Sequence, residues 1–285
     1  IRTETPKPMV KTEPAPAPAA PSIRTETPKP MVKTEPAPAP AFPADRGMEG
    51  TRAGEVREFG GIEMVWCPPG EFLMGSPEDE EGRSDDETQH RVTLTRGFWM
   101  AKTETTQGQW ERVMGGNPSL FKDSENAVNN VSWNDVQVWL QKMNQLHSQG
   151  SSWSWALPME CQWEFACRAG TTTAISGTGD LDEMGWFEKS TGRKGKLVAT
   201  KRSNSWGLND MHGNVQEWCA DWYDDYEIAP TNDPKGPASG TKRVLRGGSE
   251  AYPFEFCRSA SRSQKFPEKS DLFVGFRPVL VPSNP

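Results

Sequence analysis

The sequence predicts an α+β domain with much irregular structure, preceded by a proline-rich tail. Few segments repeat apolar residues at helical spacing, whereas many short segments have the composition of strands, with long loops between them. All 12 tryptophans follow residue 50, which favours a folded unit held by aromatic packing. By contrast, 12 of the 25 prolines lie in the first 50 residues. We therefore assign residues 1–50 to the tail and residues 51–285 to the domain.

The tail is largely a perfect tandem repeat, because residues 1–19 recur at 23–41. This composition cannot bury enough apolar surface to offset the entropy of ordering. We therefore expect a disordered stalk in extended polyproline conformations. A plain disordered tail and a docking site for proline-reading domains are the alternatives. We favour a spacer, since duplication lengthens a tether without having to preserve a motif.

The charge balance bears on the partners of the chain. The net charge of −7 argues against nucleic acid, because phosphate binding needs a basic face.

The sequence has no run of 18 apolar residues, so we expect no membrane-spanning helix. Because Ile1 is not a natural start, we expect a processed or trimmed chain.

The chain has five cysteines, none of them in CxxC spacing, which argues against a zinc site. Free buried thiols are the default expectation. One disulfide is compatible with the number, although its connectivity cannot be read from sequence. The cysteines are Cys67, Cys161, Cys167, Cys219 and Cys257.

The first part of the domain predicts short strands. Residues 63–74 indicate two strands around a Pro-Pro-Gly turn, and residues 91–95 and 98–103 are strand-like. Residues 77–88 carry seven carboxylates, for which we expect a solvated loop; a bound cation is the alternative.

Helices follow, with recognisable starts. Thr106 and Gln109 form a capping box for a helix that ends at 115–116. Ser132 and Asp135 cap the clearest amphipathic helix, which we expect to face the core. Residues 157–170 predict a second, shorter helix, and residues 189–207 are expected to be irregular.

The stretch 207–226 concentrates oxygen ligands around a Gly-Asn turn, as hard cations such as calcium require. It lacks EF-hand spacing, and spacing alone favours a metal-free turn. The oxygen-bearing side chains are those of Asp210, Asn214, Glu217, Asp221, Asp224 and Asp225.

The stretch 243–277 predicts two strand-like pieces around an aromatic loop. The glycines at 247–248 permit a positive φ and a close backbone approach. If residues 258–263 form a strand, three serines share one face and make a flat hydrogen-bonding floor. The loop 250–256 carries three aromatic residues, which suit a contact surface or, with equal weight, a lid on the core.

Eight ordered motifs across residues 60–282 resemble the formylglycine-generating-enzyme, or sulfatase-modifying-factor, domain. The resemblance implies a C-type-lectin-like α+β fold with much irregular structure. The motifs are GEFLMGS (70–76), KTETTQGQW (102–110), NVSWNDVQVW (130–139), LPMECQWEFACRAG (157–170), GLNDMHGNVQEWCADWY (207–223), RVLRGGS (243–249), CRSASR (257–262) and GFR (275–277).

The resemblance implies catalysis by two cysteines after the RGGS-like motif, together with copper. Here Tyr252 takes the first position, the loop 253–256 has no cysteine, and Cys257 resembles a structural cysteine. One thiol cannot form a two-cysteine copper site, so we expect no copper. A related branch uses an iron-binding histidine cluster, but the three histidines here lack HxxxH spacing. We therefore predict a protein that is not an enzyme.

The resemblance also implies a structural calcium ion in the 207–223 motif. Its ligands are expected to be the side chains of Asp210 and Glu217 and the carbonyls of Gly213 and Val215. The ion would pin the loop that carries Trp218 and Trp222.

The frame RGGS…CRxAxR…GFR is similar to that of non-catalytic, retroelement-diversified relatives such as the Treponema variable protein. The resemblance implies that residues 243–277 form a variable ligand-binding region on a surface-displayed protein. A divergent oxidase acting on a cysteine and a docking protein with one fixed partner are the alternatives. The predicted ligand-binding residues are Glu250, Tyr252, Phe254, Phe256, Ser259, Ser261, Ser263, Lys265, Phe266, Asp271 and Phe273.

Such proteins can be surface lipoproteins, which suits a proline-rich stalk. We therefore expect a monomer on the extracellular face of the cell envelope, as an outer-membrane lipoprotein. It would reach the membrane only through a lipid anchor upstream of Ile1. The expected partner is a protein or cell-surface ligand, whose identity the sequence does not give.

Overall fold

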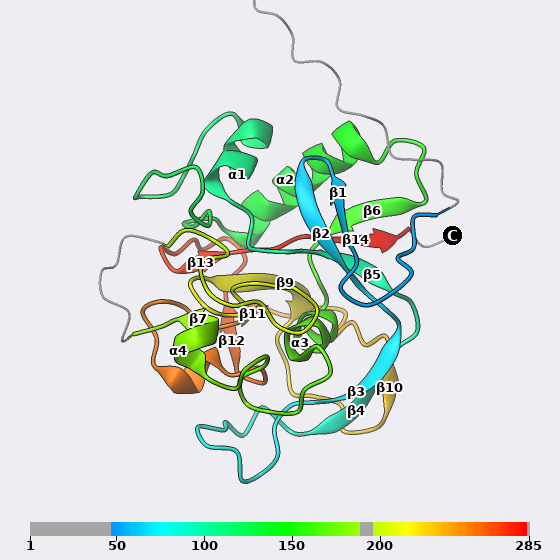
Figure 1. Cartoon of the computed structure of the whole chain (residues 1–285), viewed down its shortest axis with the longest axis vertical. Coiled ribbons are helices and arrows are strands. Elements are labelled where there is room, and N and C mark those ends of the chain that lie inside the picture. The colour runs from blue at the N-terminus through cyan, green and yellow to red at the C-terminus, as the bar shows by residue number, and fades with distance from the viewer. Residues whose placement is uncertain (1–46, 189–195, 284–285) are drawn as a thin grey trace, which may run out of the picture. The chain divides into compact units, whose positions relative to one another are not determined.

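The computed structural model describes residues 47–188 and 196–283 (Figure 1). The stalk prediction falls almost wholly on residues 1–46 and lies outside the described residues, as do positions 189–195 of the segment predicted to be irregular. The architecture is α+β, as predicted, and the described residues form short strands in four sheets and few helices. Long irregular connections join them, and among the described residues no helix has the length and apolar character to cross a bilayer.

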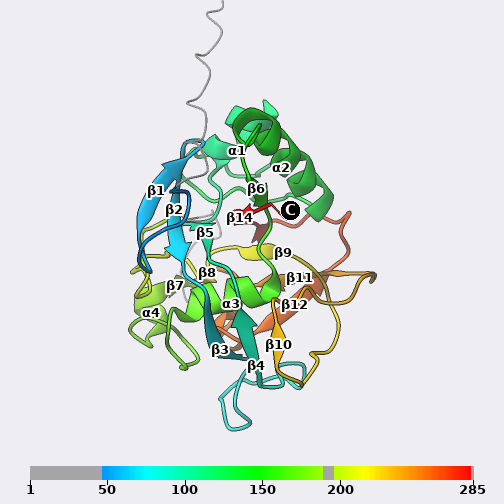
Figure 2. The same ribbon diagram turned by 90° about the vertical axis from the view of Figure 1, so that its right-hand side faces the viewer.

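The main sheet brings both ends of the domain together. Its five strands follow the order β1-β2-β5-β14-β6, so the C-terminal strand lies inside the sheet, hydrogen-bonded to β5 and β6. The helices α1 and α2 pack beside this sheet at one end of the domain (Figure 2). The bounds are β1 Val56–Phe59, β2 Ile62–Cys67, β5 Phe98–Ala101, β14 Val279–Pro282, β6 Trp153–Ala156, α1 Gln107–Met114 and α2 Trp133–His147.

Aromatic packing fills the core under this sheet, as the tryptophan content predicted. The rings of Trp139 and Phe276 lie 5.1 Å apart edge to face, and those of Trp66 and Trp99 lie 5.2 Å apart. Edge-to-face pairs add to the free energy gained by burying the ring area. The core therefore joins α2, the main sheet and the C-terminal strand into one unit.

The described residues form three smaller sheets besides the main one, and the sheet with β3 and β4 lies towards the other end of the domain (Figure 2). One has the order β10-β4-β3, the second β12-β11-β9-β13, and the third pairs β7 with β8. The bounds are β3 Gly70–Met74, β4 His90–Leu94, β10 Thr231–Asn232, β9 Gln216–Trp222, β11 Arg243–Arg246, β12 Arg262–Lys265, β13 Val274–Gly275, β7 Gly185–Trp186 and β8 His212–Gly213.

The predicted helix starts are confirmed. Thr106 and Gln109 form the capping box of α1, and Ser132 and Asp135 form that of α2. The third helix, α3 (Glu160–Arg168), lies within its predicted stretch, and its first residue donates its backbone N–H to Asp221 Oδ2 at 2.7 Å. A distant carboxylate therefore caps the helix that begins without a capping side chain. The remaining helices are α4 Leu181–Met184 and the 3₁₀ turn η1 Phe254–Cys257.

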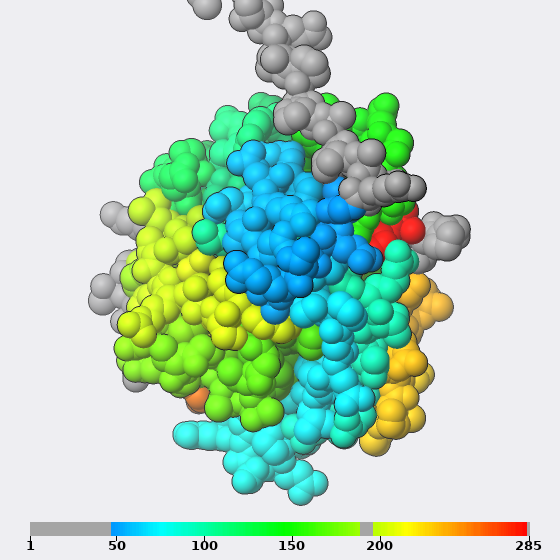
Figure 3. Space-filling view, turned by 45° about the vertical axis from the view of Figure 1, so that its right-hand side comes forward, coloured from blue at the N-terminus to red at the C-terminus, as the bar shows by residue number. Residues whose placement is uncertain are grey.

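The acidic loop 77–88 differs from the prediction of a solvated run. It projects at the lower end of the molecule, between β3 and β4 (Figure 3). Yet Arg258 donates to Glu80 Oε1 at 2.6 Å, to both oxygens of Glu87 and to the Gly82 carbonyl. Glu87 is buried. A buried guanidinium with five donors can bind two carboxylates, which turns part of this loop into structure.

Candidate functional site

The stretch 243–277 runs through an antiparallel pair of strands, β11 and β12, whose connection carries the aromatic loop. Gly247 and Gly248 have φ values of 93° and 71°, the left-handed region that glycine tolerates. A Cβ on Gly248 would lie 2.6 Å from Cys257 Sγ, too close for any larger residue. The paired glycines therefore let the loop fold back on its own strand, as predicted.

Four arginines of the motif frame are buried in ion pairs. Arg246 pairs with Glu164, Arg258 with Glu87, Arg262 with Glu160 and Arg277 with Glu217. Each guanidinium also donates to backbone carbonyls, which satisfies donors that burial would otherwise leave unpaired. The frame is therefore a scaffold of buried charge pairs, whose acidic members come from other parts of the chain.

The predicted floor of three serines is wrong. Ser259 and Ser261 are buried, and only Ser263 is half-buried, at the start of β12. Arg246 donates to the carbonyls of Ser259 and Ser261, which places this segment beneath the surface. Residues 258–261 precede the strand rather than extend it, so the predicted alternation of faces does not apply to them.

Glu250 is also buried, so its prediction as a surface contact is wrong. Its Oε2 lies 4.0 Å from Lys196 Nζ, and its backbone N–H donates to the Asn214 carbonyl. A carboxylate in this position joins two loops and is not accessible to a large ligand.

The aromatic residues of the loop divide between the two predicted roles, contact surface and lid. Phe256 is 48% exposed, and the half-buried Tyr252 lies against it with ring centroids 5.5 Å apart. Phe254 instead packs on a small buried cluster that includes Phe187 and Cys257. Tyr252 and Phe256 therefore form an aromatic pair that faces solvent, while Phe254 covers the core.

The other predicted contact residues lie on and after β12. Phe266 is 45% exposed, with the ammonium of Lys242 at 5.3 Å from its ring centroid. Lys265 Nζ donates to Asp271 Oδ2 at 2.7 Å, and both side chains are partly exposed, as is Phe273. These residues have the accessibility that the prediction requires.

The only thiol on this connection is buried. Cys257 has Gly248 against its sulfur, and burial raises its pKa to about 12, so the thiolate that a nucleophile needs does not form at neutral pH. Neither Tyr252 nor the rest of the loop supplies a second thiol. The pair of reactive cysteines that the resemblance associates with catalysis is therefore absent from the sequence at this point.

A buried histidine that sequence reasoning did not single out anchors the loop from below. His212 Nδ1 lies 2.7 Å from the Cys257 carbonyl oxygen, and its Nε2 lies 2.7 Å from Ser176 Oγ. Burial lowers the pKa of His212 to about 4, so the ring is neutral and its Nδ1–H can donate. Its place beside Gly213, within the 207–223 motif, was the only signal in the sequence.

Only some of the ligands predicted for the cation-binding loop are free to bind a cation. Glu217 accepts from Arg277 at 2.7 Å and from the Trp163 indole N–H at 2.7 Å, so its carboxylate already has strong partners. Asp210 accepts the Ala199 N–H through Oδ2, while its buried Oδ1 has no hydrogen-bond partner. Gly213 and Val215 lie in the same turn and are buried. The Asp210 carboxylate therefore fits a cation better than that of Glu217.

Glu104 is a second acid at this loop that sequence reasoning missed. It is fully buried, neither carboxylate oxygen has a hydrogen-bond partner, and burial together with the charge of Asp210 raises its pKa. Burial likewise raises the pKa of Asp210 to about 6. Within residues 47–188 and 196–283, no three His, Cys, Asp or Glu side chains form a ready-made metal cluster. A cation here would need backbone carbonyls as well as these two acids.

The four-sheet α+β arrangement and the buried arginine frame define a formylglycine-generating-enzyme-type domain with a C-type-lectin-like fold. The chain belongs to the FGE-sulfatase family, because residues 52–281 match the family described as sulfatase-modifying factor enzyme 1-like domain. The fold and family predicted from the motifs are thus confirmed.

Relatives similar in sequence include two formylglycine-generating enzymes. The formylglycine-generating enzyme of Streptomyces coelicolor is 34% identical over 191 residues, 59% of this chain and 57% of that protein. That of Mus musculus is 30% identical over 210 residues, 66% of this chain and 52% of that protein. The chain thus spans just over half the length of these two relatives.

Two solved structures match most of the chain. Treponema denticola variable protein 1 gives a TM-score of 0.70 at 27% identity, covering 79% of this chain and 98% of that one. PvdO from Pseudomonas aeruginosa gives a TM-score of 0.71 at 25% identity, and the match covers 81% of this chain and 99% of that one.

Proposed function

We propose that this protein is a non-enzymatic, surface-displayed ligand-binding protein, with a diversified binding face in residues 243–277. The observation that carries the proposal is the aromatic pair of half-buried Tyr252 and exposed Phe256 on a rigid frame of buried ion pairs. Rigid aromatic side chains supply contact area at a low cost in conformational entropy. The likeness to Treponema denticola variable protein 1 supports the same function.

The face that we propose is smaller than the one predicted from sequence. It comprises the accessible members of the predicted set, and it omits Glu250, Ser259 and Ser261 because they are buried. Phe254 contributes by supporting the loop from beneath. The proposed contact residues are Tyr252, Phe256, Ser263, Lys265, Phe266, Asp271 and Phe273.

A divergent oxidase is the second candidate, favoured by the identity to formylglycine-generating enzymes. The buried Cys257, alone on its loop, supports the binding function instead. The two functions are separated by incubating the protein with copper and a cysteine-containing peptide while oxygen consumption is recorded. We expect no turnover above that of a Cys257→Ser variant. Copper-dependent turnover that this variant lacks would establish the oxidase.

Diversification can be tested separately from binding. We expect the genome to hold a template repeat of the segment encoding residues 243–277, differing at adenine positions, beside a reverse transcriptase gene. Uniform sibling copies with no such gene would remove diversification and leave a docking protein with one fixed partner. The partner we propose is a protein or cell-surface ligand rather than nucleic acid. Display on the cell envelope by a lipid anchor, and a monomeric state, belong to the same proposal.

Alanine substitutions separate support from contact within the loop. Phe254→Ala is expected to lower the free energy of unfolding by about 2 kcal/mol, because this ring packs on a buried cluster. Phe256→Ala, at a half-exposed ring, is expected to cost under about 0.5 kcal/mol. Urea unfolding of both variants measures the difference. Equal losses would mean that Phe256 also serves as a lid.

We further propose that the loop around Asp210 binds a structural calcium ion, held by Asp210 and Glu104 with the carbonyls of Gly213 and Val215. The unpartnered buried oxygens of both acids support this site. The ion would supply a positive charge that keeps the two carboxylates ionised.

Calcium is therefore expected to raise the melting temperature relative to EDTA, by about 5–10 °C at a hundredfold excess over Kd. Asp210→Ala should abolish this response, whereas Asp225→Asn, at an exposed acid of the same stretch, should retain it. A calcium response that survives in Asp210→Ala would place the ion elsewhere.

A further inference from the structure

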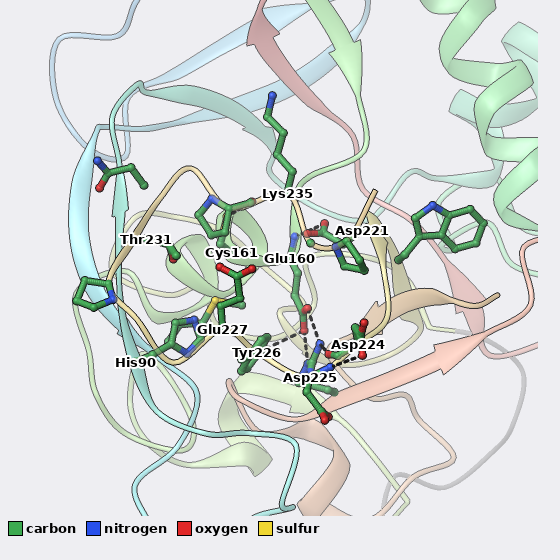
Figure 4. Close-up of a pocket in the computed structure, with 18 residues that line it drawn as sticks. His90, Glu160, Cys161, Asp221, Asp224, Asp225, Tyr226, Glu227, Thr231 and Lys235 are labelled. Atoms are coloured by element: carbon green, nitrogen blue, oxygen red, sulfur yellow. Dashed lines mark hydrogen bonds and ion pairs between the residues drawn. The ribbon is translucent and has the colours of Figure 1, made fainter. Parts of the chain in front are cut away.

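A cavity of about 630 Å³ opens beside the loop that carries β10. Figure 4 shows it between the end of β9, the first turn of α3 and β4. Its volume is in the range of small-molecule sites. None of the aromatic residues assigned to the binding face lines it, so the proposed function does not use it.

One acid at the back of the cavity is neutralised. Both oxygens of Glu160 accept from Arg262, at 2.7 and 2.9 Å, and one also accepts from the Tyr226 hydroxyl at 2.9 Å (Figure 4). This arrangement satisfies the buried ion pair internally. Glu160 and Arg262 therefore form a wall of the cavity and are not its binding groups.

A second acid lining the same cavity, Asp221, has no ion pair among the described residues, although the charges of Arg262 and Arg243 act on it from further away. Asp221 is only 5% exposed, and its one hydrogen bond to another described residue is from the Glu160 N–H to Oδ2. Across the described part of the chain, no Lys, Arg or His nitrogen lies within ion-pairing distance of it. Burial and the neighbouring charge of Glu160 raise its pKa to about 7. A bound cation in contact with this carboxylate would favour its ionised form.

The mouth of the cavity has the charge that attracts such a ligand. Asp224, Asp225 and Glu227 are exposed around it, against the single ammonium of Lys235. A concave site lined mainly by one sign of charge concentrates ions of the opposite sign. Pro234 and Pro237 add apolar surface for the rest of the ligand.

We propose that this cavity binds a small organic cation with an ammonium or guanidinium group, which donates charge-assisted hydrogen bonds to Asp221. An organic cation fits better than a metal ion, because Glu160 is already bound by Arg262, which leaves Asp221 as the buried carboxylate that the cavity offers to a ligand. Such a cation needs one buried carboxylate and room for its carbon chain, and the cavity offers both.

Titration calorimetry on the whole chain with agmatine and n-butylammonium tests the proposal. We expect saturable binding of one cation per chain, and no binding of neutral 1-butanol. Asp221→Asn keeps the shape of the side chain and an acceptor for the Glu160 N–H, yet it should weaken binding roughly tenfold or more. Asp225→Asn, at the exposed rim, should change the affinity by less than about threefold.

A second variant keeps the test decisive if Asp221→Asn is unstable. Glu227 is exposed, so Glu227→Arg should fold, and it places a tethered guanidinium at the mouth of the cavity. We expect this variant to lose binding of the added cation. The proposal is overturned if folded wild-type protein binds neither cation at millimolar concentration. It is equally overturned if Asp221→Asn and Glu227→Arg both bind like wild type.

Discussion

Replacing Arg277 with methionine is expected to lower the free energy of unfolding by about 3–5 kcal/mol. The Arg277 guanidinium is fully buried, and it donates to both oxygens of Glu217 as well as to the Ala101 and Asn209 carbonyls. Methionine fills much of the volume but leaves a buried carboxylate without its cation. The loss reflects that uncompensated charge more than the worth of the intact pair.

Thermal and urea unfolding measure this loss, which corresponds to a fall of roughly 10 °C in melting temperature for a domain of this size. The free energy of unfolding of Arg277→Lys should lie between those of Arg277→Met and wild type, because one ammonium cannot reach two oxygens and several carbonyls at once. Arg91→Met is the matched control, because its pair with Glu71 has both side chains about half exposed. Arg91→Met should lower the free energy of unfolding by less than about 1 kcal/mol. Equal losses at the buried and exposed pairs would contradict the scaffold role of the frame.

Arg258→Ala is expected to release the acidic loop 77–88. The substitution removes the cation shared by Glu80 and Glu87 and the donor to the Gly82 carbonyl. Two carboxylates, buried at 8% and 1% side-chain exposure, would then repel each other without compensation. We expect the stability to fall by about 3 kcal/mol, and most of this loss should appear as local opening of the loop.

Limited proteolysis with trypsin reads this opening directly, through cleavage after Arg83 within the loop. The cleavage rate should rise at least tenfold in Arg258→Ala. Arg202→Met, which removes an exposed pair with Glu183, should leave the rate unchanged. Unaltered cleavage in Arg258→Ala would mean that other contacts, such as that of Tyr223 with Asp86, suffice to hold the loop.

Local signals predicted the helices well, because their causes lie within a few residues. The capping boxes at Thr106 and Ser132 involve partners three residues away, which a sequence displays directly. The start of α3 depends instead on a distant group, because the N-cap residue Met159 has no side chain that can accept a hydrogen bond from the helix. Asp221, which accepts the Glu160 N–H, lies 61 residues further along the chain.

The candidate site was harder to predict for the same reason. Tyr252, Phe256 and Phe266 are accessible as predicted, whereas Glu250 and Ser259 are buried. Alternation along residues 258–263 suggested a strand, but these side chains are placed by Arg246 and by acids far away in the chain. Composition of a loop shows which chemistry is present and leaves open which side chains reach solvent.

By itself, the sequence determined the family, the α+β class, the capped helices and the missing pair of cysteines, since each rests on residue identity or short spacing. Only the tertiary structure decided the partners of the frame arginines, the burial of Glu250 and the serines, and the exposure of Asp221 to a cavity. Burial and charge pairing depend on groups brought together from up to 178 residues apart, as between Arg258 and Glu80, and no local pattern records such distances.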